Sequence, residues 1–183
     1  MIRLRRLDGG QFRAVAGQAA AVYGAAMRRS PEIVVQRREI LAEHAGYPGF
    51  ACTAAFDGVA EDTDDVLAGE LVGFGYGYLG ARGQWWHDTV ALALGRDEAR
   101  RWLRDSFELA ELHVEPGHQN AGIGRKLLAD VLEQTRAQRA VLSTPDAQTP
   151  ARELYRSFGF ADLLCGFHFP GSAEAYAIMG VTL

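Results

Sequence analysis

The chain has few cysteines and no long apolar run. Only Cys52 and Cys165 occur among its 183 residues, far apart and each flanked by apolar residues. We therefore expect two buried, reduced thiols, and no Cys/His spacing predicts a metal site. No apolar run approaches the roughly 18 to 20 residues that span a bilayer, and Met1 to Arg6 lack the apolar segment of a secretory signal. The expectation is a cytoplasmic protein without a membrane partner.

The chain also lacks an excess of positive charge. Its 19 Lys and Arg residues face 23 Asp and Glu residues, which gives a formal net charge of -4. This balance argues against a general nucleic-acid surface, so no nucleic-acid partner is expected. The acidic run Glu61 to Asp65 lies between two apolar stretches and is interpreted as the solvated tip of a hairpin.

No repeat, low-complexity tract or interdomain linker interrupts the sequence. With 48% hydrophobic and 23% charged residues, the composition is typical of a globular protein. A length of 183 residues is that of one ordinary domain, large enough to bury a core without disulfides or metals. We therefore predict a single domain over residues 1–183.

Hydrophobic periodicity predicts a mixture of helices and strands. Ser30, Pro31 and Glu32 form a typical helix start, with Ser as the N-cap residue and Pro at the first helical position. The predicted helices cover residues 11–27, 31–45, 97–103, 122–137 and 150–157. The predicted strands cover residues 2–7, 50–56, 66–79, 140–143, 160–168 and 175–181, with a further strand from residue 107.

The most informative stretch runs from Phe107 to Leu128. An apolar strand leads through a glycine-bearing loop into a helix whose apolar residues share one face: Ile123, Leu127, Leu128, Val131 and Leu132. The first turn of such a helix presents free backbone N–H groups and the positive end of the helix dipole. Gly122 and Gly124 let a phosphate oxygen approach the main chain, and Arg125 and Lys126 add positive charge. The stretch therefore predicts an anion site.

Two common phosphate loops do not fit this stretch. A Walker loop needs Lys followed by Ser or Thr after its last glycine, whereas here Lys126 is followed by Leu127. A dinucleotide fingerprint needs GxGxxG in the first strand–helix unit, and the chain offers only Gly122-Ile-Gly124, late in the sequence. Neither a P-loop NTPase nor a Rossmann dinucleotide enzyme is predicted.

Two blocks, Gln119 to Gly124 and Thr149 to Phe160, together resemble the GNAT superfamily of acetyl-CoA-dependent N-acetyltransferases. Gln119-Asn-Ala-Gly-Ile-Gly124 matches the family signature Q/R-x-x-G-x-G/A. The segment from Thr149 to Phe160 is similar to the second block, N-x-x-A-x-x-L-Y-x-x-x-G-F. One position departs, because Thr149 stands where the block usually has Asn, which puts a side-chain contact to pantetheine in question.

The resemblance implies an α/β fold with a partly splayed mixed sheet flanked by helices, and acetyl-CoA as co-substrate without a metal. It assigns the thioester carbonyl to main-chain groups of Leu112, His113 and Val114. An N–H group at this position would stabilise the oxyanion of the transition state by about 3 kcal/mol. The remaining residues that the resemblance assigns to the coenzyme are Gln119, Asn120, Ala121, Gly122, Ile123, Gly124, Arg125 and Thr149.

The resemblance also suggests the catalytic pair. Glu108 and Glu111 differ by three positions and point to opposite faces of a regular strand. Members with an acid on this strand commonly carry it six residues before the last Val, which favours Glu108 as base. Tyr155 stands where the family's Tyr approaches the coenzyme sulfur, so it is the expected acid. His87, His113 and His118 are weaker candidates.

The expected reaction is direct acetyl transfer to a primary amine of a small molecule or peptide. An alternative is a non-catalytic acyl-CoA-binding regulatory module, and a third is an acyltransferase for longer acyl groups. The acceptor should contact residues 23–30, 76–88 and 167–176, which are rich in aromatic residues and favour a partly apolar amine. If the acidic run at 61–65 covers the acceptor, it favours cationic amines.

Residues 80–105 form a longer connection between the third and fourth strands than the resemblance implies. This insertion contains Trp85 and Trp86, which are poorly suited to a solvated loop. Three readings stay open: the tryptophans line an acceptor pocket, form the interface of a possible homodimer, or build a small satellite core.

Overall fold

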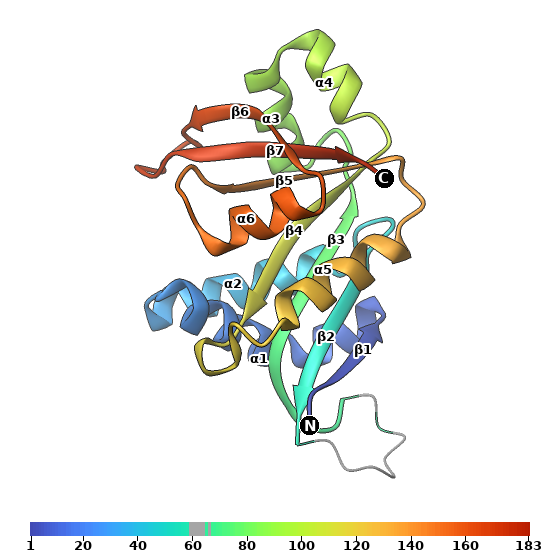
Figure 1. Ribbon diagram of the computed structural model, residues 1–183, viewed down its shortest axis with the longest axis vertical. Coiled ribbons are helices and arrows are strands. Elements are labelled where there is room, and N and C mark those ends of the chain that lie inside the picture. Colours follow the sequence, from blue (N-terminus) through green and yellow to red (C-terminus); the bar gives the residue numbers. More distant parts are fainter. Residues whose placement is uncertain (59–64, 66) are drawn as a thin grey trace. The chain divides into compact units, whose positions relative to one another are not determined.

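The computed structural model describes residues 1–58, 65 and 67–183. Apart from Asp65, the predicted acidic tip therefore lies outside the described residues. The described chain forms two compact units, Met1–Tyr78 with Glu111–Thr135, and Leu79–Ala110 with Arg136–Leu183. Seven strands pair in the order β1-β2-β3-β4-β5-β7-β6 (Figure 1), with parallel and antiparallel neighbours. This mixed sheet with flanking helices confirms the predicted fold class.

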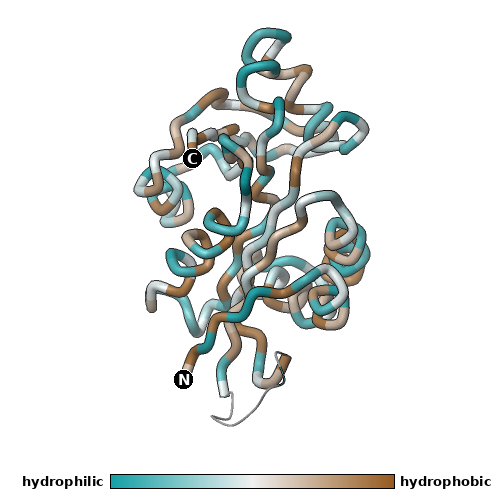
Figure 2. Tube along the Cα trace, turned by 90° about the vertical axis from the view of Figure 1, so that its right-hand side faces the viewer, coloured by the Kyte–Doolittle hydropathy of each residue, from teal (hydrophilic) through white to brown (hydrophobic). Residues whose placement is uncertain are grey.

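The first unit contains three antiparallel strands, part of a fourth, and three α-helices. Its elements are β1 (Arg3–Leu7), α1 (Gly9–Met27), α2 (Pro31–His44), β2 (Ala51–Asp57), β3 (Glu70–Leu79), the second half of β4 (Ser106–Val114), the short helix η1 (Pro116–His118) and α5 (Ile123–Gln134). In Figure 2 the helices alternate hydrophilic and hydrophobic stretches, as expected of helices that cover a sheet.

Strand β3 explains how helices cover both faces of this sheet. Its aromatic residues face α1, where the ring of Tyr76 lies 5.1 Å from that of Phe12. Its glycines face α5: a Cβ at Gly75 would stand 3.7 Å from Val131 Cγ2, and one at Gly73 would stand 3.3 Å from Leu127 Cδ1. The alternation of glycine and aromatic residues therefore lets α5 approach one face closely while the rings fill the other.

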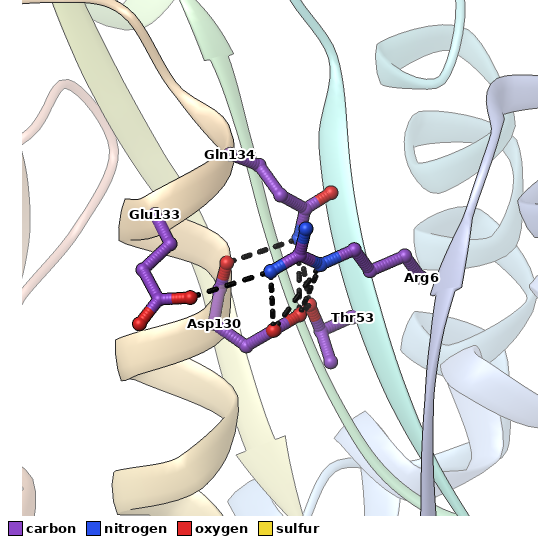
Figure 3. Close-up of polar contacts among 5 residues, drawn as sticks. All are labelled: Arg6, Thr53, Asp130, Glu133 and Gln134. Carbon is purple, nitrogen blue, oxygen red and sulfur yellow. Dashed lines mark hydrogen bonds and ion pairs between the residues drawn. The ribbon is translucent and has the colours of Figure 1, made fainter.

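A polar network fixes α5 to β1 and β2 (Figure 3). Arg6 donates to Asp130 through Nη2 at 2.7 Å and through Nε at 3.0 Å. Thr53 Oγ1 donates to the same carboxylate at 2.6 Å and accepts from Gln134 Nε2 at 2.8 Å. The hydrogen bond from Arg6 lowers the pKa of Asp130. The network therefore holds the helix whose first turn follows the glycine loop.

In the second unit, helices pack against the remaining strands of the sheet. Its elements are α3 (Trp85–Leu94), α4 (Arg96–Trp102), the first half of β4, β5 (Arg139–Pro145), α6 (Pro150–Ser157), β6 (Ala161–Phe167) and β7 (Tyr176–Thr182). Strand β4 pairs in parallel with β5, whereas β7 is antiparallel to both β5 and β6. An apolar core joins α3 and α4 to the strands and contains Val90, Leu103, Val141, Phe169 and Ile178.

The two adjacent tryptophans of the insertion have different surroundings. Trp86 packs against this core, and its Nε1 donates to Ser143 Oγ at 3.0 Å. Trp85 is 61% exposed, although its ring lies 5.4 Å from that of Phe169. Trp86 therefore fits the satellite-core reading, whereas Trp85 leaves the pocket and interface readings open.

Four expectations need correction. Helix α3 was not predicted, because its apolar residues WW, V, AL and AL give no clear polar face and Gln84 provides no side-chain cap. Strand β3 begins at Glu70, so residues 67–69 of the predicted strand lie outside it, and Leu67 N donates to Asp65 Oδ1 instead. Helix α5 ends at Gln134 rather than residue 137, where Thr135 becomes extended.

The fourth correction concerns the cysteines. Cys52 is buried, and burial raises its pKa. Cys165 is exposed, contrary to the expectation, because it lies on β6, the last strand in the sheet order. Its Sγ accepts from Arg152 Nη2 at 3.5 Å.

None of the helices in the described part of the chain is long and apolar enough to cross a bilayer.

Candidate functional site

The glycine loop has the backbone geometry of an anion site. Asn120 and Gly122 adopt left-handed conformations, with φ of 60° and 76°. Gly122 is the N-cap residue of α5, and no side chain caps the helix there. A Cβ placed on Gly122 would meet no atom within 4 Å, so the space that a side chain would fill is open. The first N–H groups of α5 are therefore available to an anionic ligand.

Local hydrogen bonds shape this loop. Gln119 Nε2 donates to the Val114 carbonyl at 2.9 Å, which joins the loop to the end of β4. Glu115 N donates to Val72 O at 2.8 Å, and His118 Nδ1 lies 2.7 Å from Glu115 Oε2. His118 is thus a loop residue that supports the turn. The side chain of Gln119 therefore organises the loop, and its predicted contact with the coenzyme stays a prediction.

The second half of β4 presents apolar and polar side chains to opposite faces. Leu112 and Val114 pack with Leu127 of α5. Glu111 and His113 point to the other face, where the ring of His113 lies edge-on to that of Tyr23 at 5.2 Å. The main chain of residues 112–114, which the resemblance assigns to the thioester carbonyl, therefore lies between an apolar layer and a polar cluster.

That polar cluster is built around Glu111, whose side chain is 10% exposed. Its Oε1 accepts from Arg37 Nη1 at 2.9 Å, and its Oε2 is hydrogen-bonded to His113 Nε2. Arg37 Nη2 also donates to the Tyr23 hydroxyl at 3.1 Å. A second pair, His44 Nδ1 and the Tyr76 hydroxyl, lies at 2.9 Å. We call these six residues the Glu111 cluster.

The pKa values in this cluster follow from burial and charge. Burial raises the pKa of Glu111, but the hydrogen bond with His113 and the charge of Arg37 lower it by more, so the net shift is downward. Burial lowers the pKa of His44. At neutral pH the cluster therefore contains an ionised Glu111 and a neutral His44.

The other predicted residues lie in the second unit. Tyr155 is buried on α6, with its ring 5.9 Å from that of Phe160. Thr149 Oγ1 accepts from Arg152 N at 3.1 Å, so this departure from the family pattern serves as the N-cap of α6. Glu108 is 2% exposed and stands opposite Val141 in the parallel pairing of β4 with β5. His87, on α3, contacts Asp88 Oδ1 at 2.9 Å.

Sequence reasoning missed most of the Glu111 cluster. Arg37 and Glu111 are 74 positions apart, so no local pattern joins them. One signal was present on α2: Arg37 and His44 stand four residues before and three residues after Leu41, the buried residue of that helix. Polar residues on the buried stripe of a helix are candidates for a site.

Comparisons with known proteins show the family of the chain. Residues 56–162 match the model of the acetyltransferase (GNAT) domain family. A GCN5-like protein acetyltransferase of Mycobacterium tuberculosis is 35% identical over 187 residues, covering 91% of each chain.

Solved structures with low sequence identity share the fold. A structure described as a GNAT-family acetyltransferase of Desulfovibrio desulfuricans superposes with a TM-score of 0.66 at 18% identity, covering 100% of this chain and 99% of its own. An acetyltransferase structure of Salmonella typhimurium with acetyl-CoA gives 0.62 at 17% identity, covering 100% and 94%. From the family match and the relative at 35% identity, the chain belongs to the GNAT family of acetyltransferases, and it is an acyltransferase.

Proposed function

We propose that the chain transfers the acetyl group of acetyl-CoA directly to a primary amine of a peptide or small molecule. The observation that carries this proposal is the uncapped first turn of α5 behind Gly122, with open space where a Cβ would stand. The M. tuberculosis relative, at 35% identity, is named as a protein acetyltransferase, which favours a peptide amine.

The residues of the loop fit the phosphates of coenzyme A. The N–H groups of the first turn of α5 would hold the pyrophosphate oxygens, and the exposed Arg125 would add charge. Main-chain groups of Leu112, His113 and Val114 would hold the thioester carbonyl. The coenzyme supplies the activated acetyl group, and the protein supplies orientation and proton transfer.

Acetyl transfer forms a C–N bond and breaks a C–S bond, so one proton must leave the amine and one must reach the sulfur. We assign the second role to Tyr155, whose hydroxyl gives a proton to the departing thiolate and regains one from solvent. Thr149, by capping α6, fixes the helix that carries Tyr155.

Two groups are candidates for the proton acceptor. Glu108 is the candidate that the resemblance favours. His113 is the candidate that the Glu111 cluster favours: a carboxylate at Nε2 promotes the tautomer with hydrogen on Nε2, which leaves Nδ1 to accept a proton. Glu111 itself is a weak base, because its lowered pKa and its ion pair with Arg37 disfavour the protonated form.

The test follows acetyl-CoA consumption and free thiol release with a panel of peptide and small-molecule amines. We expect turnover with at least one primary amine. The variants Glu108→Gln and His113→Gln are compared. The variant that removes the proton acceptor should have a kcat/KM roughly 10²-fold lower, and its pH profile should lose the limb that reports this group. If His113 is the proton acceptor, Glu111→Gln should lower kcat/KM by a smaller factor. If Glu108 is the proton acceptor, Glu111→Gln should leave kcat/KM nearly unchanged.

The outcomes separate the alternatives. If coenzyme A binds but no amine is acetylated, the chain acts as a non-catalytic acyl-CoA-binding module. If longer acyl groups are transferred faster than acetyl, the acyl specificity proposed here is wrong. If both Glu108→Gln and His113→Gln retain full activity, proton transfer proceeds through water without either residue.

A further inference from the structure

A depression in the second unit is lined by arginines, none of which is assigned to acetyl transfer. It has a volume of about 530 Å³ and opens between the end of α4 and the segment that enters β5. Its lining residues are Arg100, Arg101, Arg104, Asp105, Arg136, Ala137, Gln138 and Arg139. Five arginines and one aspartate give this lining a formal charge of +4, whereas the whole chain carries -4.

Few acidic groups offset these arginines. Arg104 Nε lies 3.5 Å from Asp105 Oδ2, and Arg101 Nη1 lies 3.9 Å from Glu98 Oε1, in pairs whose side chains are all more than half exposed. Such exposed pairs contribute little. Within the described ranges, the side chains of Arg100, Arg136 and Arg139 form no ion pair or hydrogen bond. The depression therefore holds guanidinium groups with free donors.

The arginines of the depression lie close enough together to repel one another. A cube of the same volume has an edge of about 8 Å, comparable to the Debye length at physiological ionic strength. Screening therefore leaves part of the mutual repulsion in place. A bound anion would offset that repulsion, and a planar guanidinium pairs with phosphate through two parallel hydrogen bonds.

We propose that this depression binds a small molecule carrying several phosphate groups. Its volume lies within the range of small-molecule sites, about 300 to 1,000 Å³. None of its lining residues is aromatic, so affinity should depend on the clustered phosphates and not on stacking of a base. A ligand held by both segments would tie the α4–β4 turn to the start of β5.

This site differs from the glycine loop in chain position and in chemistry. The loop precedes α5 and offers backbone N–H groups, whereas the arginine depression is formed by residues after α4 and after α5 and offers side chains. The proposal does not depend on acetyl transfer. It fails or succeeds on binding alone, so its outcome is distinguishable from that of the proposed function.

The test is calorimetric titration of inorganic triphosphate into the intact protein saturated with coenzyme A, which removes competition at the glycine loop. ATP, a short RNA and an acidic peptide are titrated in parallel. We expect triphosphate to bind, with affinity that falls as salt increases. Equal or tighter binding of ATP also supports the proposal and shows that a nucleoside is accepted.

Variants locate the binding. Arg100→Gln combined with Arg139→Gln should weaken triphosphate at least about tenfold, since each lost guanidinium removes a charge-assisted contact. Arg96→Gln is the matched control, because Arg96 is an exposed arginine of the same helix outside the depression. It should leave triphosphate affinity unchanged, and all variants should bind coenzyme A as the parent does.

Three results would overturn the proposal. The first is no binding of triphosphate to the folded protein. The second is an equal loss in the Arg96→Gln control, which would indicate a diffuse surface effect. The third is binding of RNA or acidic peptide without triphosphate, which would make the depression part of a macromolecular interface.

Discussion

The two units offer different kinds of candidate phosphate-binding groups. In the first unit the candidate groups are backbone N–H groups, made accessible by Gly122 and held in place by an α5 that Asp130 anchors. In the second unit they are guanidinium groups, while an apolar core holds α3 and α4 against the strands. A backbone site depends on one conformation and should be lost by a single substitution, whereas a side-chain site should weaken stepwise.

The largest expected effect comes from Gly122→Asp. A carboxylate at the N-cap would repel the pyrophosphate and occupy the open space, so coenzyme A affinity should fall by roughly 10³-fold, about 4 kcal/mol. Gly122→Asn is the matched control, because Asn has the same shape without charge and tolerates a positive φ. Calorimetry should show a much smaller loss for Asn. Equal affinities for Asp and the parent would remove the glycine loop from the site.

Tyr155→Phe should sharpen the division of labour between the units. Coenzyme A affinity should stay within about twofold, while kcat falls roughly 10²-fold, because only the transition state uses the hydroxyl proton. The ring contact with Phe160 is preserved in the Phe variant, which makes it the appropriate conservative change. An unchanged kcat under single-turnover conditions would reduce Tyr155 to a packing residue.

The sequence predicted those features that depend on local patterns. Glycines before an amphipathic helix located the loop, and Thr149 followed by Pro located α6, whose bounds match the prediction at 150–157. The Glu111 cluster was not predicted as a unit, because its contacts join α1, α2, β3 and β4 across long sequence separations. Exposure of Cys165 was missed for a related reason, since only the strand order shows that β6 ends the sheet.

Trp86→Ala should cost the second unit about 2 kcal/mol of unfolding free energy, since it removes core contacts and leaves Ser143 without its donor. Trp85→Ala, at a 61% exposed neighbour, should change stability by less than about 0.5 kcal/mol. Denaturant unfolding of both variants measures the difference. If Trp85 instead joins two copies, light scattering should report a lighter particle for Trp85→Ala; altered acceptor selectivity at constant mass would place it in a pocket.

The smallest expected effect concerns the anchor of α5. Asp130→Asn should cost about 1 kcal/mol at pH 7, because the network is partly exposed and its ion pair with Arg6 is screened by solvent. The pKa of Asp130 is lower in the folded chain than the unfolded value of about 4. Its ionised form therefore contributes stability above that pH, and the contribution is lost as pH falls through the folded pKa.

The parent and Asp130→Asn should accordingly converge in unfolding free energy as pH is lowered below about 4. Glu133→Gln is the matched control on the same helix: its carboxylate is 71% exposed and lies 3.4 Å from Arg6 Nη2, so its removal should have no measurable effect. A gap between parent and Asp130→Asn that persists unchanged in acid would mean that Asp130 acts through hydrogen bonding to Thr53 and not through charge. Because α5 carries the glycine loop, the same variant should weaken coenzyme A binding by no more than a few-fold, which calorimetry at pH 7 can measure.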